Sequence, residues 1–500
     1  MDLKKQQPSY FHNRISVLGS VLSVAFFVII AALFLLDFLT KEKDPFLETV
    51  TFLIAPAFLI LSLLLIPGGA LLERSRRRKR EAIPPLPNID LNNPLHQKWF
   101  YVTAGVVTLF LLFTAFGLYR AFEFTESNTF CGRLCHSVME PEYTAYQRSP
   151  HTRVGCAKCH IGYGAEWYVR SKITGLYQVY STIAKAYSRP IETPLRSLRP
   201  ARETCEQCHW PQIFLGSLDQ SHDYFLPDES NTEWKTRMMV HVGGGADFTA
   251  RKQGIHWHVT GNNKIYYIAT DKKRQTIPWV RVVAPDGKET VFVDKGSPYT
   301  AENPPKGEMR LMDCIDCHNR PSHQYKAPAE AVNQAMTHGA IDPSLPFIKR
   351  EAVNALTGEY ATSEDAVNKI SLTLSDFYKQ KYPQIWEREQ AKVLKSIAAI
   401  VQVYKANFFP QMKVSWKAYP NNIGHLNSPG CFRCHSGRHQ SGGGSAISNT
   451  CSSCHDIIAQ GPLGRVEGDL KGLDFKHPDT GDADERQGMP CFECHTGENA

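Results

Sequence analysis

The sequence predicts a mainly α protein with little regular structure, in which three transmembrane helices precede a large polar part that contains a small antiparallel β insertion. Three long uncharged stretches lie within the first 120 of the 500 residues. All 14 cysteines fall beyond them, in seven short motifs that also contain histidine. A membrane anchor followed by a cysteine-patterned outer region is therefore the architecture that these observations favour.

The uncharged stretches cover residues 15–36, 49–72 and 99–119. Each is long enough, as a helix, to cross a hydrocarbon core of about 30 Å. The run Pro67-Gly68-Gly69 would shorten or kink the second helix. We expect residues 1–120 to form a membrane anchor with three helices.

The orientation of the anchor follows from its basic residues. Six basic residues follow the second stretch, and Lys4, Lys5 and Arg14 precede the first. The positive-inside rule puts the N-terminus in the cytoplasm and everything after Arg120 outside the cytoplasmic membrane, in the periplasm of a bacterium. A cleaved signal peptide is disfavoured because the first run is too long.

Residues 1–120 carry 13 Lys and Arg against 8 Asp and Glu. They supply most of the net charge of +7, so no nucleic-acid partner is expected.

Six of the seven motifs read Cys-x-x-Cys-His, and the first reads Cys-x-x-x-Cys-His. Two thiols at this spacing can add to the vinyl groups of a haem, and the adjacent histidine can then bind the iron as proximal ligand. Zinc knuckles or disulfides would not require a histidine after every second cysteine. We therefore expect seven covalent c-type haems, at motif 1 (Cys131, Cys135, His136), motif 2 (Cys156, Cys159, His160), motif 3 (Cys205, Cys208, His209), motif 4 (Cys314, Cys317, His318), motif 5 (Cys431, Cys434, His435), motif 6 (Cys451, Cys454, His455) and motif 7 (Cys491, Cys494, His495).

Twelve other histidines can supply distal ligands, although His12 and His96 fall on the cytoplasmic side. Short spacing to a motif favours four of them as ligands of neighbouring haems, and a fifth lies between the last two motifs. His338 is expected at the surface. The favoured distal ligands are His151, His323, His425, His439 and His477, and the less certain ones are His241, His256 and His258. Alternation in the sequence 255–259 predicts a strand with His256 and His258 on one face.

Around the first motifs the chain resembles the NapC/NirT family of membrane-anchored multihaem quinol dehydrogenases. The resemblance covers residues 100–210 and 314–323, and it depends on a helix before motif 1, Met139, Pro141-Glu142-Tyr143, Ser149-Pro150-His151 and Lys172. It implies oxidation of menaquinol and delivery of electrons to periplasmic c-type cytochromes in anaerobic respiration or extracellular electron transfer. Met139 would then be a candidate ligand of the first iron.

The chain departs from the family at three places. Motif 1 has a three-residue gap and Met139 lies three residues after His136, so either residue could bind the first iron. The sequence 175–178 lacks the acid that some relatives place beyond the residue matching Lys172. Residues 324–500 lie outside a four-haem core.

Residues 166–189 combine aromatic and basic side chains, as helices in the membrane interface do. Only ten residues separate Arg120 from Cys131, so the first haem should lie close to the bilayer. Lys172 is our candidate for the quinol site, since a partly desolvated lysine can relay a proton. The alternative is that Lys172 only reaches toward lipid headgroups.

Beyond the anchor we expect a haem region over residues 121–215, a β-rich insertion over 216–310 and a second haem region over 311–500. Strands are predicted at 264–270, 277–283 and 289–293, and helices between residues 329 and 408. Within this helical part, Thr362 and Asp365 resemble a capping box, and Pro383 fits a second helix start. Two other functions remain open: a terminal multihaem reductase, or a membrane-tethered electron wire without a quinone site.

Overall fold

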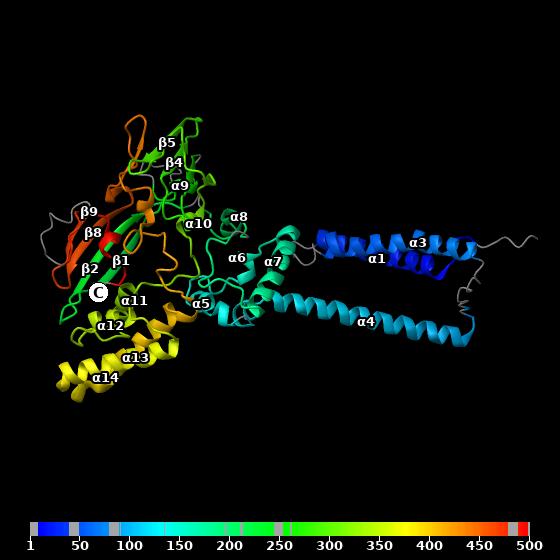
Figure 1. Ribbon diagram of the computed structural model, residues 1–500, viewed down its shortest axis with the longest axis horizontal. Coiled ribbons are helices and arrows are strands. Elements are labelled where there is room, and N and C mark those ends of the chain that lie inside the picture. Colours follow the sequence, from blue (N-terminus) through cyan, green and yellow to red (C-terminus); the bar gives the residue numbers. More distant parts are fainter. Residues whose placement is uncertain are drawn as a thin grey trace, which may run out of the picture. The chain divides into compact units, whose positions relative to one another are not determined.

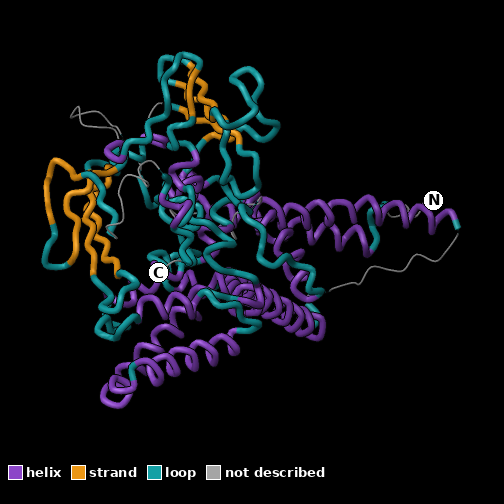
Figure 2. Tube along the Cα trace, turned by 60° about the vertical axis from the view of Figure 1, so that its left-hand side comes forward, coloured by secondary structure: helices purple, strands orange, loops and turns teal. Residues whose placement is uncertain are grey.

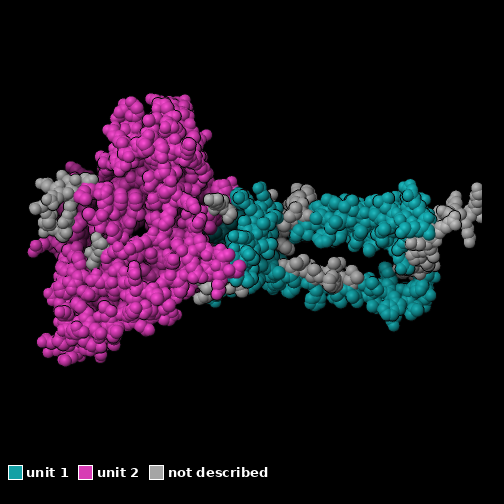
Figure 3. All heavy atoms as spheres, in the orientation of Figure 1, with its two compact units in different colours: residues 1–134, 155–183 teal, residues 135–154, 184–500 magenta. Residues whose placement is uncertain are grey.

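A computed structural model of the chain describes residues 9–39, 50–79, 90, 92–134, 136–195, 198–210, 214–244, 254–260, 263–478 and 489–498. It divides into two compact units (Figure 3). Unit 1 comprises residues 1–134 and 155–183, and unit 2 comprises residues 135–154 and 184–500. The division falls inside motif 1, between Leu134 and Cys135.

Unit 1 is helical. Its elements are α1 (Arg14–Leu39), the π-helix η1 (Val50–Ile54), α3 (Ala55–Arg78), α4 (Pro94–Glu126), the π-helix η2 (Phe130–Leu134), α6 (Cys156–His160) and α7 (Ala165–Ile183). By length and composition α1 and α3 can cross a membrane, as predicted for the first two stretches. The third stretch lies in α4, a helix of 33 residues. Several of its side chains lie outside the described part, so its crossing of the membrane remains a prediction.

Helices α1 and α3 pack against each other through small and polar residues. The hydroxyls of Ser23 and Ser62 lie 3.0 Å apart, and Ser16 donates a hydrogen bond of 2.8 Å to the carbonyl of Ile66. A Cβ atom on Gly69 would lie 2.5 Å from Ser16 Oγ, so only glycine permits this approach. Close packing through small residues is typical of helix pairs in lipid.

Unit 2 contains a helical core built by α11 (Pro328–Thr337), α12 (Ile348–Leu356), α13 (Ser363–Lys381) and α14 (Pro383–Asn407), labelled in Figure 1. The side chain of Thr362 accepts a hydrogen bond of 3.1 Å from Asp365 N, and Pro383 begins α14, which confirms both predicted helix starts. The exposed His338 caps the end of α11.

The remaining helices of unit 2 are short, apart from α5, and most carry motifs: α5 (His136–Gln147), α8 (Ala201–Cys205), α9 (Trp257–Thr260), α10 (Cys314–Cys317), α15 (Cys491–Cys494) and the 3-10 helices η4 (Pro410–Met412), η5 (Gly430–Arg433) and η6 (Cys451–Ser453).

Unit 2 also holds two antiparallel sheets, visible as separate groups of strands in Figure 2. The predicted sheet is confirmed as β3 (Lys264–Ile268), β4 (Trp279–Val283) and β5 (Glu289–Asp294), and it is extended by β6 (Arg310–Leu311) and β7 (His439–Ser441) in the order β6-β3-β4-β5-β7. The second sheet was not predicted. It has the order β1-β2-β8-β9, with β1 (Ser217–Phe225), β2 (Glu233–His241), β8 (His455–Pro462) and β9 (Glu467–Leu473).

One local prediction was wrong. The run around His256 and His258 does not form a strand but ends in the short helix α9. The backbone N–H groups of Val259 and Thr260 both donate hydrogen bonds of 3.0 Å to the carbonyl of His256, and the Thr260 hydroxyl donates a third, of 2.8 Å. These bonds close a helical turn, so the two-residue alternation of the sequence does not control the local backbone here.

Candidate functional site

Three motifs fold as a helical turn that carries both cysteines, in α6, α10 and α15. In motifs 5 and 6 the 3-10 turns η5 and η6 carry the first cysteine and the second cysteine caps the turn, while α8 ends at Cys205, the first cysteine of motif 3. Residues three apart on a helix lie on the same face, so the two thiols of a motif can reach one ligand. Motif 1 differs because Cys131 lies in the π-helix η2, whose wider turn accommodates the extra residue. The side chains of Cys135 and His136 lie outside the described part.

Cysteines of different motifs are also neighbours. A hydrogen bond between the thiols of Cys131 and Cys156 raises the pKa of Cys131 and lowers that of Cys156 to about 7. The thiols of Cys205 and Cys314 are joined in the same way, which lowers the pKa of Cys205 and raises that of Cys314. The first cysteines of motifs 1 and 2 are therefore neighbours within unit 1, and motif 3 adjoins motif 4 in unit 2.

Consecutive motifs are also neighbours farther toward the C-terminus. Burial raises the pKa of Cys317 to about 11, and the nearby Cys431 thiol contributes to the rise. Burial likewise raises the pKa of Cys454 to about 11, again with a contribution from Cys431. The pKa of Cys491 is raised by burial and then by the neighbouring Cys451. Motifs 3 to 7 thus adjoin one another in the order of the sequence.

Five motif histidines of unit 2 face a histidine from outside the motifs. A metal bound by two imidazole nitrogens at about 2 Å each, with roughly 1 Å from each nitrogen to its ring centroid, separates the centroids by about 6 Å. The observed separations and interplanar angles fit this value: His151 and His209 (6.0 Å, 74°), His256 and His318 (6.3 Å, 3°), His258 and His435 (5.7 Å, 79°), His425 and His455 (6.2 Å, 20°) and His477 and His495 (5.8 Å, 32°).

Backbone carbonyls hold several of these rings by the nitrogen that does not face the partner. His256 Nδ1 lies 2.6 Å from the carbonyl oxygen of Val242, His258 Nδ1 2.7 Å from that of Ile255, and His435 Nδ1 2.7 Å from that of Ser448. Such bonds fix the tautomer and leave Nε2 for a metal. Burial lowers the pKa of His258, which favours the neutral form that a metal ligand requires. The residues present therefore fit haem ligation through two histidines.

The other predicted ligands have different surroundings. His323 Nδ1 lies 2.9 Å from the carbonyl oxygen of Glu142, which would orient its Nε2 toward a ligand position. His439 is fully buried, with Nε2 lying 2.7 Å from the carbonyl oxygen of Ile277, and His241 Nε2 lies 3.0 Å from the carboxylate of Asp456. Met139 is half-buried in α5.

The carboxylate of Glu142 also holds a buried ion pair. It accepts hydrogen bonds of 3.0 and 2.7 Å from Arg320, whose guanidinium lies 4.1 Å from the ring centroid of Tyr419. Burial, with a contribution from Glu142, raises the pKa of Tyr325 beside this pair. The pair therefore fixes the segment after motif 4 against α5.

A buried carboxylate anchors motif 4. Asp316 accepts hydrogen bonds from the Tyr267 hydroxyl at 2.7 Å, from Arg310 at 2.9 Å and from Arg274 at 3.2 Å. Its second oxygen accepts a bond of 2.7 Å from Asp313 N, which completes a capping box at the start of α10. Three elements of unit 2 thereby hold the turn that carries Cys314 and its neighbours.

In unit 1, Lys172 of α7 meets the end of α4. Its ammonium forms an ion pair with Glu126 and donates a hydrogen bond of 3.2 Å to the Thr125 hydroxyl. Nζ also lies 4.9 Å from the ring centroid of Tyr168. The charges of Glu126 and Lys172 both act on the thiol of Cys131, the first cysteine of motif 1. Sequence reasoning missed Glu126, because the acid comes from another helix, 46 residues earlier.

Helix α7 also presents an exposed apolar stripe at helical spacing. Its members are each more than 60% exposed: Ile173, Leu176, Tyr177, Tyr180 and Ile183. Exposed apolar stripes of this kind are typical of helices that lie in a membrane interface.

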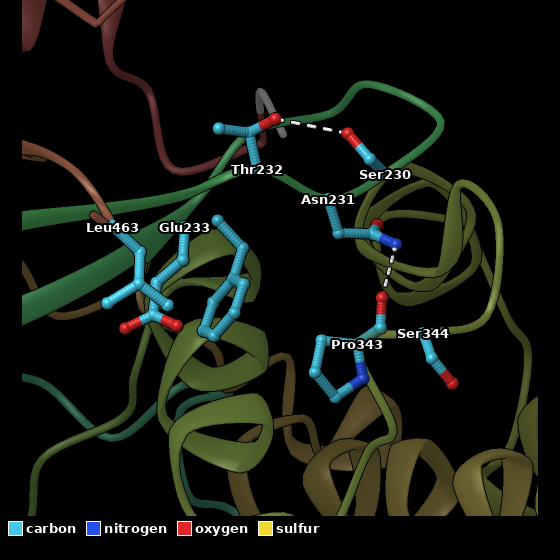
Figure 4. A pocket seen from close by; sticks show the side chains of 8 residues that line it. Ser230, Asn231, Thr232, Glu233, Pro343, Ser344 and Leu463 are labelled. Carbon is cyan, nitrogen blue, oxygen red and sulfur yellow. Dashed lines mark hydrogen bonds between the residues drawn. The ribbon is translucent and has the colours of Figure 1, made fainter. Parts of the chain in front are cut away.

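A surface hollow of about 380 Å³ lies elsewhere in unit 2 (Figure 4). Asn231 donates a hydrogen bond of 3.0 Å to the carbonyl of Pro343 at its edge. Since no cysteine, histidine or cation lines it, the hollow offers nothing to a haem; its lining residues are Phe225, Ser230, Asn231, Thr232, Glu233, Pro343, Ser344 and Leu463.

Residues 94–194 match the model of the NapC/NirT cytochrome c family, N-terminal region. The chain belongs to this family of membrane-anchored electron-transfer cytochromes with covalently bound c-type haem. It is 41% identical to the cytochrome c-type protein ImcH of Geobacter sulfurreducens over 498 residues, which cover 99% of this chain and 97% of that protein. No solved structure matches the chain.

Proposed function

We propose that this cytochrome is a menaquinol dehydrogenase of the bacterial inner membrane, which passes electrons through seven c-type haems to periplasmic cytochromes. Its N-terminus lies in the cytoplasm and its haem-bearing part in the periplasm. The observation that carries the proposal is the ion pair of Lys172 and Glu126 beside Cys131. A proton-accepting group and the first cysteine of motif 1 thus lie together in unit 1, next to an apolar helix face.

Oxidation of menaquinol to menaquinone breaks two O–H bonds and releases two protons and two electrons. The haems supply the one-electron acceptors. Glu126 can accept a proton as a carboxylate, while Lys172 orients it and stabilises its charge. Thr125 keeps the ammonium in place. Removal of either charge leaves the other without its partner.

The adjacency of the motifs supports an electron path in sequence order. Cys131 of motif 1 adjoins Cys156 of motif 2 within unit 1, and motifs 3 to 7 form a continuous series within unit 2. Motif 7 ends the series, and its Cys494 is exposed. We infer that electrons enter at motif 1 and leave for a soluble cytochrome at motif 7.

Rapid mixing of the oxidised, detergent-solubilised protein with a reduced menaquinone analogue tests the proposal, with haem absorption as the readout. Lys172→Gln and Glu126→Gln should slow haem reduction by roughly 100-fold or more, the contribution of a positioned proton acceptor. Arg170→Gln is the matched control, because Arg170 lies on the same helix, exposed over Trp167.

Dithionite should reduce all four proteins alike. The proposal fails if the wild type stays oxidised with the quinol analogue while dithionite reduces it. In that case the protein is a tethered wire or a terminal reductase. Equal rates in all variants would remove Lys172 and Glu126 from the site.

A further inference from the structure

We propose that the segment at α9 supplies the distal ligands of two different haems, His256 to the haem of motif 4 and His258 to the haem of motif 5. The inference rests on the seven-haem assignment above and not on quinol oxidation. Both histidines lie outside residues 94–194, the part of the chain that matches the family model. One three-residue segment would then join two irons.

Ring geometry supports each ligation separately. The centroid of His256 lies 6.3 Å from that of His318, and the centroid of His258 lies 5.7 Å from that of His435. Both separations fit one metal between two imidazoles, which requires about 6 Å. His318 and His435 are the histidines of motifs 4 and 5, so each ring of the pair faces a different haem.

The helical turn explains why two histidines so close in sequence serve two haems. His256 immediately precedes α9 and its carbonyl accepts the bonds that close the turn, whereas His258 lies within α9, so the two rings do not share one strand face and lie against different motif histidines. Carbonyls on different segments hold the two rings by Nδ1, that of Val242 for His256 and that of Ile255 for His258. A strand, as the sequence pattern suggested, would have directed both rings to one side.

Two further contacts keep the same motifs together. The thiols of Cys317 and Cys431 are electrostatic neighbours, and Arg433 of motif 5 donates a hydrogen bond of 2.7 Å to the carbonyl of Asp316 in motif 4. His439, the candidate that sequence spacing favoured near motif 5, instead directs Nε2 at the carbonyl of Ile277. His258 is therefore the better placed ligand for motif 5.

The two ligations differ in a measurable way. The rings of His256 and His318 are nearly parallel, at 3°, whereas those of His258 and His435 are nearly perpendicular, at 79°. Parallel axial imidazoles give a ferric low-spin haem a rhombic electron paramagnetic resonance spectrum, and perpendicular ones give a highly anisotropic spectrum with a single large g value. The wild-type ferric protein should show both classes.

His256→Met and His258→Met test the assignment in the chemically oxidised protein, without quinol. Each variant should convert one haem of the seven to methionine ligation, seen as a new near-infrared charge-transfer band and one haem titrating at higher potential. His258→Met should remove one haem equivalent of the highly anisotropic signal, and His256→Met one equivalent of the rhombic signal. His439→Met is the matched control and should change neither.

Loss of the anisotropic signal in His439→Met, or its retention in His258→Met, would overturn the assignment for motif 5. Retention of all rhombic signal in His256→Met would overturn it for motif 4. If the variants do not accumulate, absence of a highly anisotropic component from the wild-type spectrum still overturns the assignment for motif 5, because it contradicts the perpendicular pair of His258 and His435. Failure of menaquinol to reduce the protein would leave these spectra unchanged, so the two proposals fail separately.

Discussion

The guanidinium of Arg433, in the middle of motif 5, donates a hydrogen bond of 2.7 Å to the main-chain carbonyl of Asp316, in the middle of motif 4. The same side chain donates to the carbonyls of Arg274 at 3.0 Å and Gly430 at 2.8 Å. One arginine therefore satisfies three backbone acceptors and fixes the two motifs relative to each other. The two residues are 117 positions apart in the chain, so local sequence does not determine this geometry.

Arg433→Leu should lower the free energy of unfolding by about 2–4 kcal/mol, because the partly buried carbonyls of Arg274 and Gly430 lose this donor and that of Asp316 keeps only the bond from Asn422. The measurement is thermal unfolding followed by haem absorption and circular dichroism. Arg438→Leu is the control, since Arg438 forms an exposed ion pair with Asp294, worth about 1 kcal/mol or less. Equal melting temperatures for the two variants would contradict the anchoring role of Arg433.

Glu142→Gln should destabilise unit 2 by about 3 kcal/mol, the cost of leaving the buried Arg320 without its partner. Glu203→Gln removes a carboxylate from the more exposed pair with Arg199 and should cost less than about 1 kcal/mol. Denaturant unfolding of the haem-loaded protein measures both. A Glu142 variant as stable as the wild type would show that Arg320 finds another acceptor.

Lys349 should make stability depend on pH. Its side chain is 1% exposed, Nζ donates a hydrogen bond of 2.6 Å to the carbonyl of Ala329, and burial lowers its pKa to about 7. Between that value and the usual 10.5, the unfolded chain holds a proton that the folded chain lacks, so stability rises with pH. The slope is at most about 1.4 kcal/mol per pH unit.

Lys349→Met should remove this contribution, so the wild type should gain stability relative to the variant as the pH rises from 7.5 to 9.5. Thermal unfolding at several pH values is the measurement. Lys369→Met, at an exposed pair with Asp365, should show no such trend. A constant difference for Lys349→Met would mean that the buried amine does not change protonation on unfolding.

Gly69→Leu should separate α1 from α3, because a side chain there meets Ser16 Oγ at 2.5 Å. The expected cost is about 1–3 kcal/mol, seen as a lower melting temperature in detergent. Gly68→Leu is the neighbouring control, since nothing lies within 4 Å of its Cβ position. Similar losses in both variants would indicate a general effect of leucine on the helix.

The sequence predicted what local patterns determine. Apolar length located α1 and α3, the capping residue Thr362 located the start of α13, and the alternation of β3 to β5 located one sheet. The sheet of β1, β2, β8 and β9 was not predicted, because β1 is the mostly polar segment Ser217–Phe225 and because β2 pairs with β8, more than 200 residues later in the chain. No periodicity in β1 indicates an apolar face.

The residues of the candidate sites, too, could be predicted only where a local sequence pattern marks them. Motif spacing identified the cysteines and the adjacent histidines, but the partner of each ring is set by the tertiary fold. His258 and His435, for example, are 177 residues apart in the chain and face each other at 5.7 Å. Glu126 was not predicted because the sequence that follows Lys172 in α7 lacks an acid, and the carboxylate comes instead from α4.

The contact between the thiols of Cys205 and Cys314 has a consequence for biogenesis. In an oxidising compartment, two thiols at hydrogen-bonding distance are prone to join as a disulfide. A chain that folded before receiving its haems would bring these cysteines together and could trap a cross-link between motifs 3 and 4. In the periplasm that we propose for this part of the chain, attachment of the haems before folding would avoid this cross-link.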